Sequence, residues 1–389
     1  MEWIPRNRDP FRCSPSGGPS TRWTPRSYSS PRSRPARRRA RRLVLITGLR
    51  GVGKTVLLNE FETMCAEAGW YADTKEVGRT TPLVTLVSRV ARTALLDMDA
   101  RKRAGAKLRR ALGALKSFEI SILGAATLKV EVDALAGVAD SGVLAEDMRD
   151  LLVAVGQAAE ESGVGFALIL DELQNATKDE YEALIMALHR AKQKALPVVF
   201  VGGGLPLLPA LTTDAKSYAE RMFVFPKLGA LPRAAARAAL MLPAERLDVR
   251  WDDAAVDRVL ELTEGYPFFL QEYGRRVWRL DDSPRITRSD VDGAQPVVEA
   301  ELDEEFYENR IGKLTDAERL YASALAHLGD GPQRVRDIAE LMGRTTTSLS
   351  PVRDDLMRTA VIYAPNRGFV DFTVPHCARF VRRNYPFDG

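Results

Sequence analysis

One stretch of 13 residues, LVLITGLRGVGKT at residues 43–55, restricts the possible folds of this chain more than any other. The apolar run Leu43–Ile46 leads into a glycine-rich turn, Gly48–Thr55, which fits the pattern G-x-x-x-x-G-K-[ST] at every fixed position. A helical pattern begins directly afterwards. Small residues let successive backbone N–H groups turn toward one anion, and the N-terminus of a helix adds the positive end of its dipole. The stretch therefore predicts a strand, a phosphate-binding loop and a helix.

The residue types in this loop predict its ligand. Lys54 has the length to reach the β- and γ-phosphates of a nucleotide, where it would both bind and assist catalysis, and the Thr55 hydroxyl can bind Mg²⁺. A chance glycine turn before a helix is the alternative, and the order strand, loop, Lys-Thr, helix argues against it. The residues predicted to bind the cofactor here are Gly48, Gly51, Val52, Gly53, Lys54, Thr55 and Val56.

A second apolar run ends in two carboxylates. Residues 166–170, FALIL, are followed by Asp171 and Glu172, which is the Walker B arrangement. We predict that Asp171 holds Mg²⁺, directly or through water, and that Glu172 polarises the water that attacks the γ-phosphate. Many strands end in Asp, so the pattern is informative because a complete phosphate loop precedes it. A pair of surface carboxylates is the alternative.

Composition excludes several classes of protein. The 389 residues are enough for two or three domains, and 45% of them are hydrophobic. The cysteines, at positions 13, 65 and 377, are odd in number and far apart, which argues against a disulfide framework or a zinc site and fits a reducing cytoplasm. The three histidines have no metal-ligand spacing. No apolar run approaches the length needed to cross a bilayer, and the N-terminus lacks the apolar region of a secretory signal.

The net charge of +4 hides an uneven distribution. Residues 1–42 contain twelve Arg, no Lys and two acidic residues, whereas the remainder of the chain is mildly acidic. This Arg-, Pro- and Ser-rich segment is predicted to be disordered because it has too little apolar surface to bury. It is interpreted as a basic arm for nucleic acid or other anionic partners, or as an extension without function. A third hypothesis is that part of residues 12–42 arises from a frameshift or a wrongly assigned start.

The remaining patterns predict an α/β core with helical additions. We expect the helix of residues 54–68, a strand at 70–77 and two helices within 82–117. The alternating residues 118–134 favour a β-hairpin inserted into the core. A helix at 144–159 precedes the Walker B strand, and a further buried strand, which begins at Pro197, ends in Gly202–Gly204. Three further helices between residues 231 and 280 predict a small helical lid.

The C-terminal part is predicted to form a winged helix. An acidic helix at 296–312 leads into residues 313–389, where three helices precede a hairpin at 362–374. DNA binding would place the helix of residues 346–358 in the major groove, with Arg353 and Arg367 on bases or phosphates. Asp354 and Asp355 on that helix weaken this interpretation, and protein contacts are the alternative.

The order phosphate loop, Walker B, lid and winged helix resembles AAA+ ATPases of the origin-recognition and archaeal-ATPase type, and the related STAND ATPases. The resemblance covers roughly residues 43–383, with ITGLRGVGKTVLLNEF, LILDELQ, GGGLPLLPAL, KSYAERMFVF and TEGYPFFLQEYG among the stretches that carry it. It implies ATP as the nucleotide and nucleotide contact by Gly265-Tyr266-Pro267. AAA+ proteins usually have a polar sensor where Gly202–Gly204 stand, so we expect slow hydrolysis or sensing from elsewhere, with Gln174 as a candidate. Arg221 is interpreted as a phosphate-facing or interface arginine, or as an ordinary salt-bridge residue.

These expectations combine into one functional hypothesis. We expect an α/β P-loop core (43–228), a helical lid (229–295), and a connecting helix with a winged helix (296–389). The chain would be a cytoplasmic, slow, Mg²⁺-dependent ATPase that acts as a nucleotide-controlled switch, with DNA contacted through residues 334–374. The alternatives are a DNA-binding regulator in which ATP only controls binding, and a scaffold for protein partners or self-association that binds ATP without significant hydrolysis.

Overall fold

The computed structural model describes residues 43–100, 105–124, 133–216, 218–280 and 283–387. Backbone contacts group these residues into two units. The core unit contains residues 43–48 and 54–228, and the C-terminal unit contains Leu49–Gly53 together with residues 229–387. The predicted N-terminal tail, residues 1–42, and the middle of the predicted hairpin, residues 125–132, lie outside the described residues.

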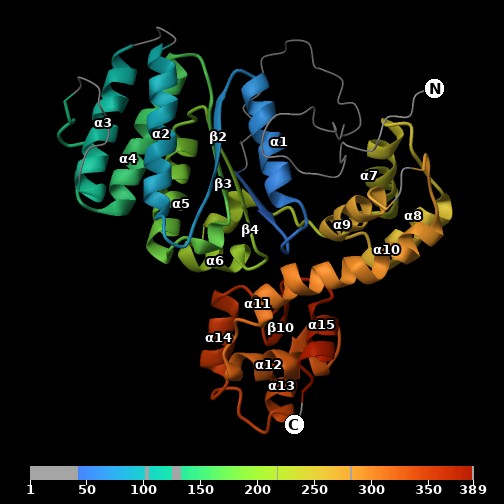
Figure 1. Cartoon of the computed structure of the whole chain (residues 1–389). Coiled ribbons are helices and arrows are strands. Elements are labelled where there is room, and N and C mark those ends of the chain that lie inside the picture. The colour runs from blue at the N-terminus through green and yellow to red at the C-terminus, as the bar shows by residue number, and fades with distance from the viewer. Residues whose placement is uncertain (1–42, 101–104, 125–132, 217, 281–282, 388–389) are drawn as a thin grey trace. The chain divides into compact units, whose positions relative to one another are not determined.

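The core unit is built on a five-stranded parallel sheet (Figure 1). Its strands stand in the order β2-β3-β4-β1-β5, so β4 separates the strand before the phosphate loop from the strand that ends in Asp171. This order places the carboxyl ends of all three strands at the same edge of the sheet, because they run parallel. The strands are β1 Leu43–Thr47, β2 Tyr71–Glu76, β3 Phe166–Asp171, β4 Val198–Gly204 and β5 Phe223–Val224.

Both faces of this sheet are covered by helices, which explains the apolar strands that the sequence contains. On one face, Ile46, Ile169 and Val201 pack against Leu58 of α1. On the other face, Leu168 and Phe200 belong to a larger cluster with the apolar sides of α2, α4 and α5 (Figure 1). The helices of this unit are α1 Lys54–Glu67, α2 Leu83–Ala100, α3 Ala106–Leu123, α4 Leu144–Glu161, α5 Lys178–Gln193 and α6 Leu208–Ala215, with the 3₁₀ turns η1 Leu173–Asn175 and η2 Ala219–Arg221.

The predicted β-hairpin at 118–134 is wrong in its first half. Residues 118–123 continue helix α3, and Gly124 ends that helix in a left-handed conformation with φ of 77°. The alternation in Phe118-Glu119-Ile120 is compatible with a helix because Leu115 and Phe118, three residues apart, are both fully buried on one face. Tertiary burial of that face decided between the two periodicities.

Strand β4 runs through the three glycines in which the sequence pattern predicts that it ends. Gly202, Gly203 and Gly204 pair with Leu45, Ile46 and Thr47 of β1. Each glycine leaves room for a neighbour. A Cβ on Gly202 would lie 2.3 Å from Leu173 Cδ1, and a Cβ on Gly203 would lie 2.7 Å from Asp171 Oδ1. The glycines are thus strand residues whose missing side chains admit the residues that follow β3.

The C-terminal unit begins with a helical segment. It contains α7 Arg233–Glu245, α8 Asp253–Thr263, α9 Pro267–Trp278 and α10 Arg288–Glu301, with the two-stranded pair β6 Arg250–Trp251 and β7 Arg285–Ile286. Tyr273, Val277 and Trp278 of α9 are buried in one apolar cluster with residues of α7, α8 and α10. Helix α10 spans the predicted boundary at residue 295 and continues into the π-helical turn η3, Leu302–Glu308, and the short helix α11, Asn309–Ile311.

The last part of this unit combines four helices with a small antiparallel sheet (Figure 1). Thr315 caps the first helix with a capping box that involves Glu318. The predicted hairpin forms, since Tyr363 pairs with Asp371 and Ile362 with Phe372. The elements are α12 Asp316–His327, β8 Gln333–Arg334, α13 Val335–Leu341, α14 Ser350–Arg358, β9 Ile362–Tyr363, β10 Phe369–Phe372 and α15 Cys377–Asn384. The sheet has the order β8-β10-β9.

Among the described residues, none of the helices has both the length and the apolar composition that a membrane crossing requires.

The close packing at Gly203 generates a stability prediction. Gly203→Ala should destabilise the chain by about 1–3 kcal/mol, because the new methyl group would be forced against Asp171 Oδ1 and against Leu58 Cδ1, 2.9 Å away. Urea unfolding followed by circular dichroism measures this change. Gly293→Ala is the matched control, since a Cβ there meets nothing within 4 Å. Equal stability of the two variants would contradict the packing described for β4.

Candidate functional site

The phosphate loop has the backbone that its glycines predict. Gly51 and Gly53 have φ values of 78° and 89°, in the left-handed region that other residues avoid. Helix α1 begins at Lys54, so the N–H groups of its first turn have no partners within the helix. The Gly48 amide donates to the Gly204 carbonyl at 3.2 Å, which ties the start of the loop to the end of β4. The loop is thus attached to a rigid sheet.

Lys54 is buried although it is charged, with 5% of its surface exposed. Its Nζ donates to the Gly48 carbonyl at 3.1 Å. This bond holds the ammonium group back across the loop, where the predicted phosphates would lie. Lys54 is also the first residue of α1, so its positive charge lies at the helix end that favours a bound anion.

Thr55 and Asp171 are brought into direct contact. The Thr55 hydroxyl donates to Asp171 Oδ2 at 2.5 Å, across 116 residues of sequence. Asp171 is 3% exposed and ends β3, and its other oxygen, Oδ1, accepts the Glu172 amide at 2.8 Å. A hydroxyl and a carboxylate are oxygen ligands of the kind that Mg²⁺ prefers, so the two predicted metal ligands form a chemically suitable pair. In the part of the chain that the structure describes, no cluster of three His, Cys, Asp or Glu side chains offers a separate metal site.

Glu172 follows Asp171 in a backbone conformation that is unusual for its residue type. It has φ of 54° and ψ of 38°, the left-handed region. Such strain persists only where surrounding contacts over-determine it, and it is concentrated at functional sites. The contacts here are the bond from the Glu172 amide to Asp171 and the bond from the Asn175 amide to the Glu172 carbonyl at 3.0 Å. Because the backbone turns at Glu172, the side chains of Asp171 and Glu172 do not alternate between the two faces of the sheet as they would in a continuing strand.

Asn175, near this site, was not predicted from the sequence, whereas Gln174 was already a candidate for sensing. The Asn175 side chain donates to the Val77 carbonyl at 2.8 Å, which fastens η1 to the end of β2. The Leu205 amide donates to Gln174 Oε1 at 3.1 Å, which fastens η1 to the end of β4. Three glycines in succession were the only sequence signal for this packing, and they did not indicate which neighbours would fill the space.

The other predicted cofactor residues have different surroundings. Val52 is buried, whereas Val56 is exposed on α1. Pro267 is the first residue of α9, where its missing N–H costs nothing. The residues on either side of it contact the loop segment Leu49–Gly53 within the C-terminal unit. The Phe268 amide donates to the Gly51 carbonyl at 3.2 Å, and the Tyr266 hydroxyl donates to the Arg50 carbonyl. Burial raises the pKa of Tyr266, so this hydroxyl stays protonated and can donate.

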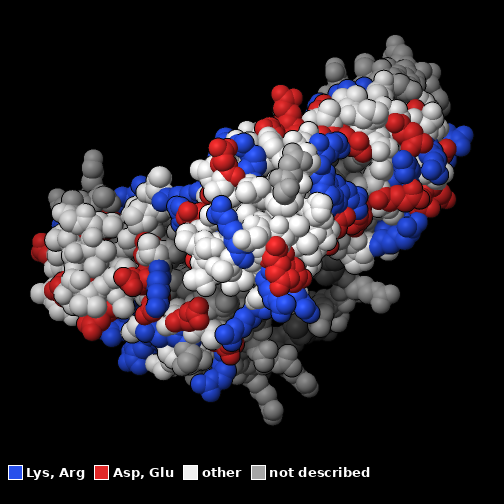
Figure 2. Space-filling view, turned by 90° about the horizontal axis from the view of Figure 1, so that it is seen from below, with Lys and Arg blue, Asp and Glu red and all other residues white. Residues whose placement is uncertain are grey.

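The predicted DNA-contacting arginines are accompanied by acids. Arg353 pairs with Asp354 at 3.1 Å, and Arg358 pairs with Asp355 at 2.7 Å, both on α14. The Asp355 bond raises the pKa of Arg358 further above its usual value. On the face shown in Figure 2, basic side chains are interspersed with acidic ones. Arg367 lies in the turn between β9 and β10, and Arg221, at the end of η2, is exposed.

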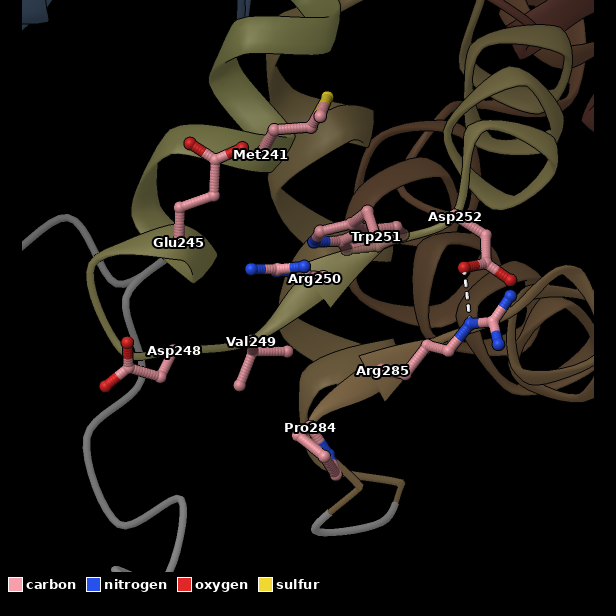
Figure 3. A pocket seen from close by; sticks show the side chains of 9 residues that line it. All are labelled: Met241, Glu245, Asp248, Val249, Arg250, Trp251, Asp252, Pro284 and Arg285. Carbon is pink, nitrogen blue, oxygen red and sulfur yellow. Dashed lines mark hydrogen bonds and ion pairs between the residues drawn. The ribbon is translucent and has the colours of Figure 1, made fainter.

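A pocket of about 990 Å³ lies in the C-terminal unit beside β6 and β7 (Figure 3). Its lining includes the apolar side chains of Met241, Trp251 and Pro284. Asp252 and Arg285 form an ion pair at 2.6 Å on its wall. None of the residues predicted to bind nucleotide or metal lines this pocket.

Comparison with known structures finds proteins of low sequence identity to this chain. The Holliday junction branch migration motor RuvB of Thermotoga maritima is 16% identical, covers 85% of this chain and 84% of its own, and has a TM-score of 0.41. The ORC1 protein of Aeropyrum pernix in complex with DNA is 15% identical, with coverages of 88% and 87% and a TM-score of 0.41. A Walker-type ATPase of Pyrococcus abyssi is 16% identical, with coverages of 87% and 91% and a TM-score of 0.49. The search of curated proteins found no match.

Two family models match the sequence. Residues 304–381 match a domain of unknown function (DUF8462), which covers α11 to most of α15. Residues 32–201 match the AAA ATPase domain, and this range includes the phosphate loop, Thr55, Asp171 and most of β4. The match supports nucleotide binding. Over residues 32–201 the chain is thus similar to the AAA ATPase domain, and this range contains the phosphate loop and the strand that ends in Asp171.

Proposed function

We propose that this chain binds ATP together with Mg²⁺ and hydrolyses it slowly, and that the bound nucleotide controls the C-terminal unit. The observation that carries the proposal is the 2.5 Å contact between the Thr55 hydroxyl and Asp171 Oδ2. It joins the helix after the phosphate loop to the end of β3, and both groups are suitable Mg²⁺ ligands. A metal held there supplies charge neutralisation on the β- and γ-phosphates.

In this proposal the loop binds the phosphates through its backbone. The N–H groups of residues 51–53 in the loop and of residues 54–56 at the start of α1 would donate to phosphate oxygens, and Lys54 would add a positive charge. Gly48 supports the loop through its bond to Gly204. The Thr55 hydroxyl and the Asp171 carboxylate offer two oxygen ligands for a metal ion. Their presence beside the loop favours a nucleotide with a bound metal over an anion alone.

Hydrolysis is assigned to Glu172, which would orient and polarise the attacking water. Its carboxylate accepts a hydrogen bond from the Gln174 side-chain amide. Gly204, at the end of β4, contributes no polar side chain of its own beside this carboxylate. This absence favours slow turnover.

Control of the C-terminal unit is assigned to the residues around Pro267. Tyr266 and Phe268 donate hydrogen bonds to the carbonyls of Arg50 and Gly51, and Pro267 lies between them. Ordering of a phosphate loop by nucleotide would change these bonds and bias the helices that follow. In the proposed switch, these hydrogen bonds would connect the phosphate loop to helix α9.

The nucleotide assignment predicts that Lys54→Ala weakens ATP binding. We expect the Kd to rise about 10- to 100-fold, because a charge-assisted hydrogen bond to phosphate is lost. Isothermal titration calorimetry with ATP and Mg²⁺ measures the change. Lys194→Ala, an exposed lysine at the end of α5, is the matched control. Retained affinity in Lys54→Ala would refute the phosphate-loop assignment.

The hydrolysis assignment predicts that Glu172→Gln abolishes turnover without abolishing binding. Phosphate release should fall by about 100-fold or more because the general base is lost, while the ATP Kd should stay within about threefold. Glu60→Gln, on the exposed face of α1, is the control. A parent chain without turnover, or an unchanged rate in Glu172→Gln, would favour the ATP-binding scaffold instead.

A second candidate function is nucleotide-controlled DNA binding by a winged helix. The element order α12, β8, α13, α14, β9, β10 and the antiparallel sheet favour that type of domain. The exposed turn with Arg367 would be its wing. The ion pairs of Arg353 and Arg358 count against strong binding, because Asp354 and Asp355 compete with phosphates for the guanidinium groups.

DNA binding by this surface predicts a defined salt dependence. Arg353→Ala and Arg367→Ala should each weaken binding uniformly across sequences and reduce the slope of log K against log salt by about one. Fluorescence anisotropy with labelled duplex DNA, with and without ATP, provides the measurement. Arg246→Ala, an exposed residue after α7, is the control. Absence of binding by the parent at low salt would remove this candidate.

A further inference from the structure

The end of strand β4 is filled from a neighbouring element rather than by its own side chains. The turn η1 follows Glu172, and its three residues make three separate contacts. Leu173 packs into the space left by Gly202, Gln174 bonds to Leu205, and Asn175 bonds to Val77. The turn is therefore fixed between the ends of β2 and β4.

Gln174 occupies the position where a side chain on residue 204 would begin. A Cβ on Gly204 would lie 2.6 Å from Gln174 Oε1, closer than real Cβ contacts allow. Gly204 also bonds through its carbonyl to the Gly48 amide, at the start of the phosphate loop. The Gln174 amide therefore contacts both the end of β4 and Glu172. The glycine and the glutamine are thus complementary, since one makes the room that the other fills.

The hydrogen bonds of Gln174 determine the orientation of its amide. Oε1 accepts the Leu205 N–H, so Oε1 must face β4. The NH₂ group then faces the other way and donates to Glu172 Oε2. Reversing the amide would set an NH₂ group against an N–H donor and a carbonyl oxygen against a carboxylate, so only one orientation satisfies both partners.

We infer that Gln174 is the positioning residue for Glu172 and replaces the polar side chain that β4 lacks. Its oxygen is anchored on the rigid strand, and its NH₂ group holds the Glu172 carboxylate at the sheet edge, next to Asp171 and the loop. This role rests on the proposed function, in which Glu172 activates water. The backbone of Glu172 alone, in its left-handed conformation, leaves the side-chain torsions free, and Gln174 restricts them.

The positioning role is tested by separating kcat from KM in three variants of the full chain. Gln174→Ala removes both contacts, and Gln174→Glu keeps the acceptor for Leu205 but removes the donor to Glu172. Both should lower kcat about 10- to 100-fold, since misplacement of a catalytic group by about 1 Å has effects of this size. KM for ATP and the ATP Kd should stay within about threefold. Gln174→Asn, one methylene shorter, should not restore kcat because it cannot span both partners.

Gly204→Ala tests the same geometry from the strand side. The added methyl group would displace the Gln174 amide and should lower kcat to a similar extent, whereas Gly293→Ala should leave kcat unchanged. Gln193→Ala, at the exposed end of α5, controls for loss of a glutamine. Urea unfolding of each variant separates a loss of folding from a loss of catalysis.

The hydrogen bond from the Leu205 amide to Gln174 can be tested by a measurement that does not depend on turnover. Amide hydrogen exchange at Leu205 should be faster in Gln174→Ala than in the parent, and nearly unchanged in Gln174→Glu, which retains an acceptor. The following residue is Pro206, which has no amide, so the signal of this segment is simple to assign.

The outcomes distinguish the inference from the proposed function. Loss of turnover in Glu172→Gln with full kcat in Gln174→Ala and Gln174→Glu would overturn the positioning role alone. Equal Leu205 exchange in the parent and in Gln174→Ala would also overturn it. A parent without turnover contradicts the hydrolytic function and with it the positioning of a base. A fall in kcat with unchanged KM and faster Leu205 exchange supports the inference.

Discussion

The hydrogen bond between the Thr55 hydroxyl and Asp171 is the interaction on which the candidate site depends. It requires that the Thr55 hydroxyl at the start of α1 and Asp171 Oδ2 at the end of β3 lie 2.5 Å apart, although β4 separates β3 from the strand that leads into the loop. The approach is possible because β4 carries glycines at its end. At Gly203 a Cβ would collide with Asp171 Oδ1, so the carboxylate stands over the middle strand where a side chain would otherwise lie. Sheet order and side-chain size together create the site.

Two charged side chains, Lys54 and Asp171, are buried at this edge of the sheet. Lys54 and Asp171 are both nearly inaccessible to solvent, and each is satisfied by hydrogen bonds from its own neighbourhood. Such groups are expensive to bury and are retained where a ligand or a reaction uses them. The left-handed conformation of Glu172 adds local strain of about 1–3 kcal/mol to the same few residues. The apolar strands β3 and β4 and the helices packed on them supply the stability that offsets these costs.

Much of the core could be predicted from the sequence, and the reasons are local. The apolar strand before the loop, the glycines and the helix that begins at Lys54 form one contiguous sequence pattern. Strand β3 can be predicted because five apolar residues precede two acidic residues. The prediction for residues 118–123 was wrong. These residues alternate in polarity but are helical. The deciding contacts come from the elements that bury one face of the helix, and periodicity along the chain does not contain them.

The sequence by itself determined the phosphate loop, the two carboxylates and the apolar elements that hold them, because each is encoded in a short run of residue types with a fixed local geometry. Only the tertiary structure decided which groups meet. It placed Thr55 on Asp171, Gln174 in the space of Gly204, and acidic partners beside the arginines of α14. These contacts depend on strand order and on the volume that a glycine leaves empty, and both are properties of elements packed side by side rather than of any one stretch of chain.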